Sequence, residues 1–182
     1  MLLIGGTSNV GKSTVAEVVA GRLGVEHRST DYLARHPGRP WRTAEREVPP
    51  HVAEHYSTLA VDELISSVLE HYARLWPRIE EIVDTADGLV LEGSALWPER
   101  VAKLTGVRSV WLTAAEDTIR ERIHDGGGYS TATDGERALM DKFLARSIRF
   151  QQLVLADVER LGLRHVEVDG RSVAEVADAI LA

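Results

Sequence analysis

The feature that most constrains this chain is the octapeptide at residues 6–13, Gly-Thr-Ser-Asn-Val-Gly-Lys-Ser. It fits the pattern G-x-x-x-x-G-K-[ST] at every fixed position, and it stands between an apolar stretch and an amphipathic one. Glycines let the backbone curve closely around an anion, and the helix that follows presents free N–H groups to the same anion. A chance match is expected in only about 1% of such chains. The sequence therefore predicts a loop that binds the phosphates of a nucleotide.

The side chains of this loop have distinct expected roles. We expect Lys12 to reach the terminal phosphates of ATP as a point charge, and the Ser13 hydroxyl to serve as a hard oxygen ligand for Mg²⁺. ATP and Mg²⁺ are thus the predicted cofactors. The loop residues assigned to the nucleotide are Gly6, Thr7, Ser8, Asn9, Val10, Gly11, Lys12, Ser13 and Thr14.

Strand and helix signals alternate along the 182 residues, which is typical of an α/β fold with a parallel sheet. We predict one domain over residues 1–182. Pro77 should interrupt the helical pattern of residues 57–85, and Gly126, Gly127 and Gly128 argue against helix over residues 125–130. Residues 113–116 read as a capping box, and residues 36–50, with four of the six prolines, as a loop. The expected strands are 1–4, 25–28, 89–91, 107–112 and 164–168, and the expected helices are 12–23, 57–76, 78–85, 98–104, 113–124, 133–161 and 172–181.

Composition excludes several classes of function. The net charge of −7 disfavours a nucleic-acid partner, since binding to nucleic acid gains from basic surfaces that release counterions. The chain has no cysteine, which excludes disulfides, thiolate metal sites and a cysteine nucleophile. No apolar run approaches the roughly 20 residues that span a bilayer. We expect a cytoplasmic protein, a monomer or homodimer, without a membrane partner.

Polar residues follow three of the predicted strands, at the edge where ligands bind in open α/β sheets. Asp31 could orient or deprotonate an acceptor hydroxyl, or simply cap a turn. Glu92 and Gly93 could hold Mg²⁺ through water and contact substrate, or form a turn before the next helix. Gly170 and Arg171 could lie beside the adenine, or form a plain strand-to-helix turn.

Cationic residues flank the glycine stretch. We expect residues 120–149 to form a lid, in which Arg122 and Arg146 stabilise the transferring phosphoryl group, Arg120 contacts nucleotide and Arg149 contacts substrate. The alternative is a solvated charged face. Trp41 and Arg42, in the proline-rich loop, are further candidates for substrate contact. His51 and His55 lie one helical turn apart, but they lack the spacing of a zinc motif around their glutamate, so a metal site there is a minor alternative.

This arrangement resembles the shikimate-kinase-like and nucleoside-monophosphate-kinase-like branch of P-loop proteins. The loop Gly-Gly-Thr-Ser-Asn-Val-Gly-Lys-Ser-Thr is similar to that of 2-phosphoglycerate kinases, and residues 25–33 resemble the strand-then-aspartate of chloramphenicol phosphotransferases. The resemblance implies a three-layer P-loop NTPase fold, with sheet order 2-3-1-4-5 and helices on both faces. It also implies that residues 32–86 bind the acceptor, that Asp31 is the base and that a lid arginine completes the site.

Two departures bear on the acceptor. Shikimate kinases carry a second aspartate where this chain has Ser29, and a triple glycine where it has Glu92-Gly93-Ser94, so shikimate is a poor candidate.

The resulting hypothesis is a phosphotransferase that moves the γ-phosphoryl group of ATP to a hydroxyl of a small molecule. A nucleoside or nucleotide kinase, in which Trp41 or Tyr56 would stack on a base, is one alternative. An ATP-binding switch or toxin-like P-loop module is the other. The charge of the acceptor stays open, because Arg35, Arg39, Arg42 and Arg46 would suit an anion while Glu45, Glu47, Glu54 and Glu63 would suit a cation.

Overall fold

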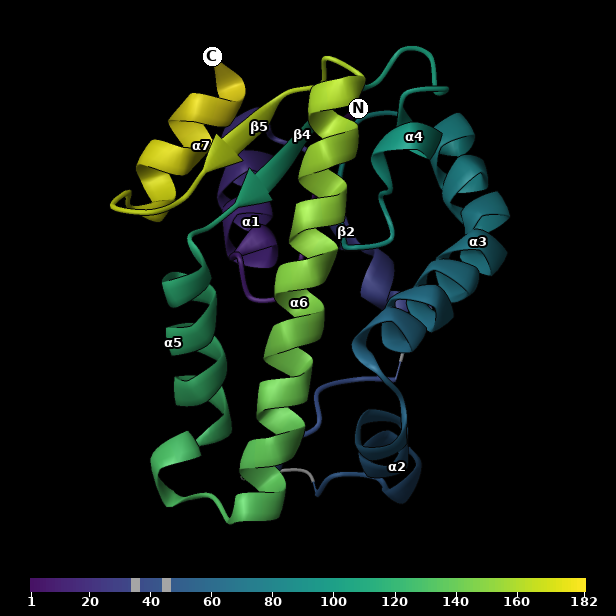
Figure 1. Cartoon of the computed structure of the whole chain (residues 1–182). Helices are drawn as coiled ribbons and strands as arrows, with labels where there is room; N and C mark the ends of the chain where they lie inside the picture. The colour runs from purple at the N-terminus through teal and green to yellow at the C-terminus, as the bar shows by residue number, and fades with distance from the viewer. Residues whose placement is uncertain (34–36, 44–46) are drawn as a thin grey trace.

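A computed structural model describes residues 1–33, 37–43 and 47–182, and Figure 1 shows the whole chain. Its five strands form one parallel sheet in the order β2-β3-β1-β4-β5. The predicted fold class and strand order are therefore confirmed. The strands are β1 (Leu2–Gly6), β2 (Glu26–Ser29), β3 (Leu89–Glu92), β4 (Arg108–Thr113) and β5 (His165–Glu167).

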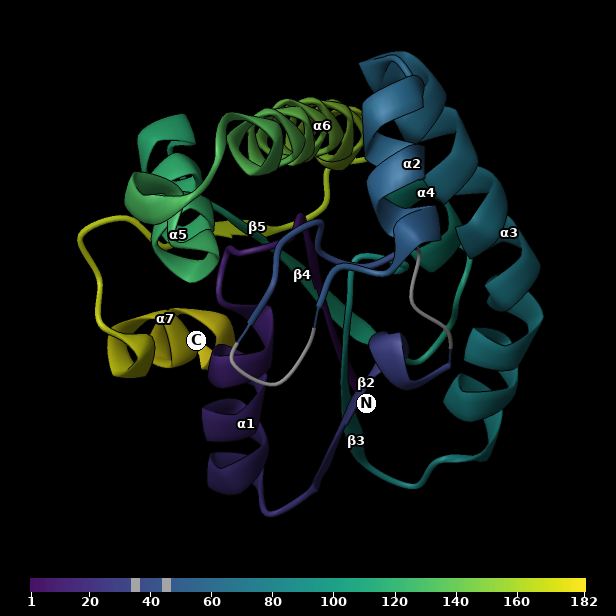
Figure 2. The same ribbon diagram turned by 90° about the horizontal axis from the view of Figure 1, so that it is seen from below.

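The helices lie on both faces of the sheet (Figure 2). They are α1 (Lys12–Leu23), α2 (Pro50–Thr58), α3 (Val61–Thr85), α4 (Pro98–Val101), α5 (Glu116–Gly127), α6 (Asp134–Arg160) and α7 (Val173–Leu181), with short 3₁₀ helices η1 (Thr30–Tyr32) and η2 (Tyr129–Thr131).

The period of two along a strand explains the layers. Leu2 and Ile4 of the central strand face one side, in the cluster that holds the buried residues of α1 and α7. Leu3, between them, belongs to the other cluster, with buried side chains of α3 and α6. Both clusters are closed to solvent, which is the pattern expected of a parallel sheet covered on both faces.

The prediction that Pro77 interrupts a helix is wrong, because α3 runs unbroken from Val61 to Thr85. Leu75, Trp76 and Ile79 are buried on either side of the proline, so the packing of both halves of the helix outweighs the hydrogen bond that proline removes. The predicted start at residue 57 is also wrong, since a separate helix, α2, already begins at Pro50. Of the predicted loop 36–50, residues 36 and 44–46 lie outside the described residues, and the described part carries no helix before Pro50.

Helix α5 extends through Gly126 to Gly127, contrary to the prediction of non-helical structure there. Gly128, with φ of 65°, ends the helix in the left-handed conformation. Gly127 packs so closely on Met140 of α6 that a Cβ would come within 2.5 Å of its sulfur. The absence of a side chain thus lets two helices approach, and this contact outweighs the low helix propensity of glycine.

The predicted capping box at residues 113–116 is not formed. The N-cap of α5 is Ala115, which has no capping side chain, and its backbone N–H donates to Asp169 Oδ2 at 2.7 Å. Asp169 comes from the loop after β5 and also accepts from the Thr118 hydroxyl. Asp169, which is distant in sequence, therefore caps the start of α5 in place of Thr113, the residue that the local pattern had predicted. No helix within the described part of the chain is long and apolar enough to cross a membrane.

Candidate nucleotide and acceptor site

The predicted phosphate loop connects β1 to the first turn of α1. Gly11, the N-cap, has φ of 91°, and Asn9 has φ of 64° although it carries a side chain. No side chain caps α1, so N–H groups of its first turn are left without a capping acceptor. The Asn9 side-chain nitrogen is also buried with no hydrogen-bond partner among the described residues. These unpaired donors are what a bound phosphate chain would satisfy.

Lys12 lies folded against its own loop. Its ammonium group donates to the Thr7 carbonyl at 2.7 Å, and the side chain is only 9% exposed. Burial lowers the pKa of Lys12, while the carboxylates of Glu92 and Asp31 act in the opposite direction. This buried ammonium group beside two carboxylates provides a positive charge that could bind the phosphates of a nucleotide.

Ser13 and Glu92 form a pair of oxygen ligands beside the loop. The Ser13 hydroxyl donates to Glu92 Oε1 at 2.9 Å, and Glu92 at the end of β3 is 2% exposed. The serine oxygen keeps its lone pairs, so it could coordinate Mg²⁺ while Glu92 fixes its orientation. The described residues hold no group of three or more potential metal-ligating His, Cys, Asp or Glu side chains. Mg²⁺ is usually held by one or two protein groups together with phosphates and water.

The loop opens into a cavity of about 970 Å³, which extends to both sides of it. On one side the walls come from the start of α7 and the loop before it, with Val168, Arg171, Val173 and Val176. The other side is lined by Asp31, Gly38, Arg39, Thr43, Tyr72, Glu92, Ser94, Phe143 and Arg146. We call the first the nucleotide side and the second the acceptor side.

The acceptor side brings together residues from distant parts of the chain. Asp31 is exposed in η1, just after β2, where Ser29 caps the turn by accepting from the Asp31 backbone N–H at 3.2 Å. Tyr72 of α3 is half-buried, and its desolvation raises the pKa of its hydroxyl, while the charge of Arg146 and hydrogen bonds with Arg146 and Ser94 lower it. Asp31 also acts on this hydroxyl. Asp31, Tyr72 and Arg146 therefore share one small space.

Two of the predicted lid arginines line the cavity and two do not. Arg122 of α5 donates to the Asn9 carbonyl at 3.1 Å, so it lies across the phosphate loop. Arg146 of α6 is buried on the acceptor side, whereas Arg120 pairs with Asp117 and Arg149 with Asp62, both away from the cavity lining. Helical spacing had placed Arg146 and Arg149 together, but only one of them faces the site.

The other predicted contacts divide in the same way. Trp41 is 2% exposed and packs edge-on against Phe143 at 5.1 Å between ring centroids, so it belongs to the core. Arg42 points to Glu136 at 3.4 Å. Arg171 lines the nucleotide side and Gly170 does not. Gly93 packs on Thr30, whose hydroxyl a Cβ would overlap.

Sequence reasoning did not single out Tyr72, which lies within the predicted helix 57–76 and the predicted acceptor segment 32–86. Its hydroxyl was the available signal, because a tyrosine in an apolar stripe needs a partner for its oxygen. Arg35, Glu45 and Arg46, which had been weighed as contacts for the acceptor, lie outside the described residues.

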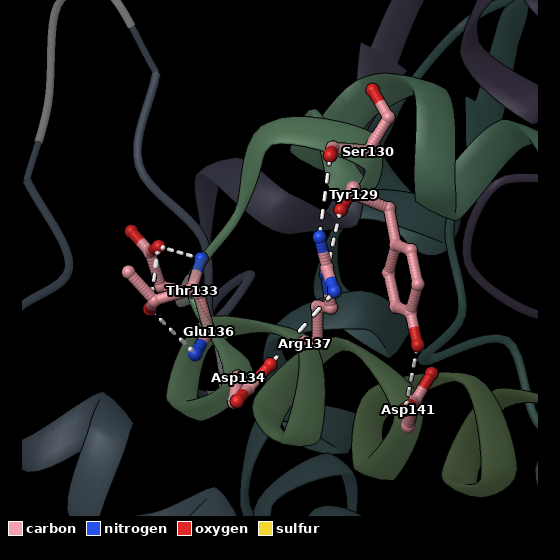
Figure 3. Close-up of polar contacts among 7 residues, drawn as sticks. All are labelled: Tyr129, Ser130, Thr133, Asp134, Glu136, Arg137 and Asp141. Carbon is pink, nitrogen blue, oxygen red and sulfur yellow. Dashed lines mark hydrogen bonds and ion pairs between the residues drawn. The ribbon is translucent and has the colours of Figure 1, made fainter.

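The corner between α5 and α6 is held by a set of polar contacts, drawn in Figure 3. Arg137 donates to the carbonyls of Tyr129 and Ser130 at 3.0 and 3.2 Å, and the Tyr129 hydroxyl donates to Asp141 at 3.0 Å. The Tyr129 ring stacks on His124 at 3.8 Å. The predicted lid region thus has an internally braced tip that joins the helix of Arg122 to the helix of Arg146.

Comparisons with known proteins identify a family and a shared fold. A sequence family described as an AAA domain matches residues 2–139. No curated protein sequence matches the chain.

Several solved structures share the fold. A gluconokinase from Sinorhizobium meliloti 1021 matches with a TM-score of 0.53 and 21% identity, over 99% of this chain and 88% of that one. A shikimate kinase from Acinetobacter baumannii in complex with shikimate gives 0.54 and 14%, over 99% and 89%. A deoxyadenosine kinase from M. mycoides with bound dATP gives 0.57 and 14%, over 99% and 96%. The resemblance to P-loop small-molecule kinases is thereby confirmed at the level of the fold.

Proposed function

This chain belongs to the AAA domain family and has the fold of P-loop kinases, and from these premises we propose that it transfers the γ-phosphoryl group of ATP to a hydroxyl group of a small molecule. The observation that carries the proposal is that the phosphate loop and Asp31 line one continuous cavity. A switch that only bound and hydrolysed ATP would not need the acceptor side of this cavity.

The residues of the loop would bind and orient the triphosphate. The backbone N–H groups and Lys12 would hold the β- and γ-phosphates, and Ser13, oriented by Glu92, would hold Mg²⁺. When bound, that ion supplies neutralisation of phosphate charge. Arg122 crosses the loop and would contact the same phosphates from α5.

Asp31 would act on the acceptor. It would orient the acceptor hydroxyl and take its proton while the oxygen bonds to the γ-phosphorus and the bond to the β–γ bridging oxygen breaks, leaving ADP. Phosphoryl transfer depends on positioning more than on covalent chemistry, and the place of Asp31 in the same cavity as the phosphate loop supports this role.

The structure gives little support to a nucleoside acceptor. Base stacking was expected from Trp41 or Tyr56, but these side chains are 2% and 1% exposed and pack against Phe143. A small polar acceptor fits the hydroxyl and guanidinium groups that line the acceptor side better.

The test is ADP release from Mg·ATP in the presence and absence of a panel of hydroxylated metabolites, nucleosides and antibiotics. The proposal expects release that depends on a particular acceptor, with the phosphorylated product detected by mass spectrometry. A Lys12→Met variant should show none. Slow release that no acceptor accelerates would contradict transfer and favour a nucleotide-dependent switch.

A further inference from the structure

The most unusual side chain on the acceptor side is Arg146. It is 5% exposed, and its guanidinium lies against the rings of Phe143 and Phe150 at 5.8 and 5.7 Å. No carboxylate pairs with it among the residues that the structure describes. Aromatic faces stabilise a cation, but they do not accept the directed hydrogen bonds of its five N–H groups. A buried guanidinium in this state is unfavourable unless something else supplies the counter-charge.

The groups around Arg146 supply few hydrogen-bond acceptors. Tyr72 and Ser94 line the same part of the cavity and carry hydroxyls, and Tyr72 already takes a hydrogen bond from Arg146. The Tyr56 hydroxyl is buried without a hydrogen-bond partner among the described residues, and its ring lies against Phe143 at 5.7 Å. Burial raises the pKa of Tyr56, and the charge of Arg146 lowers it in part. This cluster therefore has more donors than acceptors.

The two carboxylates that line the cavity do not remove this imbalance. Glu92 accepts from Ser13 and lies beside Lys12, at the phosphate loop. Asp31 is exposed and reaches Tyr72 and Lys12 through its field, but it forms no ion pair with Arg146. Asp31 is also the group that the proposed transfer assigns to the acceptor hydroxyl.

The position of Arg146 distinguishes it from the arginine at the phosphates. Arg122 donates to the carbonyl of Asn9 in the loop, whereas Arg146 faces Tyr72, which comes from α3 across the acceptor side. Arg39 also lines the acceptor side, so guanidinium groups are present in both halves of the cavity. Arg146 is the one of these on the acceptor side that is buried against two aromatic rings.

We propose that the acceptor is a hydroxy acid, whose carboxylate or phosphate group binds to Arg146 with the hydroxyls of Tyr72 and Ser94 while its hydroxyl faces Asp31. The proposal rests on the proposed phosphotransfer and deepens it by naming the acceptor class. A carboxylate or phosphate oxygen supplies both the charge and the acceptors that the cluster lacks, and a guanidinium binds either group with two parallel hydrogen bonds. The Tyr56 hydroxyl would gain an acceptor within the same cluster.

The experiment compares acids with neutral partners of the same skeleton. The pairs are glycerate and glycerol, gluconate and glucitol, shikimate and its methyl ester, with glycerol 3-phosphate, which has no carboxylate, as the phosphate member. Turnover is followed by ADP release from Mg·ATP, and binding by thermal shift with Mg·ADP present so that the phosphate loop is occupied. We expect at least one acid to be turned over with kcat/KM about 100-fold above its neutral partner, since a neutral analogue leaves buried donors unpaired. The phosphate member tells which anion is preferred.

The variants locate the effect. Arg146→Met keeps the apolar stem between the two rings and removes the charge, so KM for the acid should rise by about tenfold or more while KM for ATP is unchanged. Tyr56→Phe should raise KM for the acid by a few-fold. Arg160→Met is the matched control, because Arg160 lies on the same helix in a surface pair with Asp157, and its kinetics should equal those of the wild type.

The outcomes separate this inference from the proposed function. Neutral partners turned over as well as the acids would overturn the acid class and leave phosphotransfer standing. A fall in kcat for Arg146→Met that is equal for every acceptor, at constant KM, would assign Arg146 to the transferring phosphoryl group instead. Acids that stabilise the Mg·ADP complex without ever being phosphorylated would uphold the anion site and overturn transfer. Acids that neither bind nor react would overturn the anion site.

Discussion

At the level of single residues, Asp31 is the side chain on which the proposed transfer depends most. It is an exposed carboxylate at the end of β2 that lines the shared cavity. Asp31→Asn keeps the size and removes the base, so kcat should fall by about 100-fold or more while the KM for ATP stays near its wild-type value. Steady-state ADP release at saturating acceptor measures both. Unchanged turnover in Asp31→Asn would remove this residue from the mechanism.

Thr7 has a different role from the one its place in the loop suggests. Its hydroxyl is turned away from the cavity and donates to the Ser147 carbonyl of α6 at 2.9 Å, with the side chain 1% exposed. Thr7→Val keeps the shape and loses the donor, so the free energy of unfolding should fall by about 1 kcal/mol. Thr7→Ser should lose less, because it keeps the donor and gives up only a methyl group. Urea unfolding compares the two, and equal losses would show that the hydroxyl contributes nothing.

At the level of elements, the corner between α5 and α6 offers a matched pair of glycines. Gly126 has open space where a Cβ would stand, whereas Gly127 meets Met140, which is 1% exposed and has little room to move. Gly126→Ala should stabilise the helix by about 0.5–1 kcal/mol through better helix propensity. Gly127→Ala should destabilise by about 1 kcal/mol or more through overpacking. Thermal unfolding of the two variants measures both changes in stability. Changes of the same sign would contradict the close approach of α5 and α6.

The start of α6 should respond to acid. Thr133 and Glu136 form a capping box, and the hydrogen bonds from the Thr133 backbone and side chain lower the pKa of Glu136 below 4.5 (Figure 3). A carboxyl group with a lowered pKa in the folded state stabilises the protein above its unfolded pKa, and loses that contribution as the pH falls through the folded value. Glu136→Gln should therefore be less stable than the wild type at pH 7 and approach it near pH 3. Denaturant titrations at both pH values test this, and a gap that does not narrow in acid would contradict it.

The individual helices and strands also show which parts of the fold could be predicted from the sequence. Local patterns predicted all five strands, of which β1 and β3 are buried along their whole length, whereas β2 and β5 are short and largely polar. The errors arose where distant residues decide. Pro77 is overruled by burial on both sides of it, Gly127 by Met140, and Thr113 by Asp169 from beyond β5. Met140 and Asp169 lie far along the chain from the residues that they affect, and the burial around Pro77 depends on packing against other elements.

At the level of the whole molecule, the buried charge of Lys12 in the phosphate site lowers the free energy of unfolding. Burial lowers the pKa of Lys12, so the charged form that binds phosphate is disfavoured in the folded protein. A lysine whose pKa is lowered on folding reduces stability below the folded pKa, and this loss disappears as the pH rises toward 10.5. Lys12→Met removes this buried charge and should therefore raise the unfolding free energy of the nucleotide-free protein at pH 7.

The same variant should lose its response to nucleotide. Mg·ATP binds only the folded state and raises the Tm of the wild type by mass action, but it should leave the Tm of Lys12→Met unchanged. Calorimetric scans with and without Mg·ATP give both quantities. A Lys12→Met protein that is less stable than the wild type without nucleotide would show that the contacts with Thr7, Glu92 and Asp31 outweigh the burial of its charge.

The candidate site was predictable only where it is continuous in sequence. The loop at residues 6–13 is one stretch of chain, so its motif sufficed. The acceptor side draws on η1, α3, the turn after β3 and α6, and only the fold brings Tyr72 within reach of Arg146. Charge and helical spacing could suggest Arg146 and Arg149 together, but in the packed fold the first is buried and the second lies in a surface pair with Asp62.

The contact of Thr7 with the backbone of α6 has a consequence for how such a protein can change over generations. Helix α6 carries Arg146 toward the acceptor, and its next residue, Ser147, anchors the phosphate loop. Substitutions that shift this helix would therefore weaken ATP binding and also change the acceptor specificity. Among the hydrogen bonds of the described residues, none joins α2 or α3 to the phosphate loop. New acceptor preferences should therefore arise by drift in α2 and α3, while α6 diverges slowly among descendants of this chain.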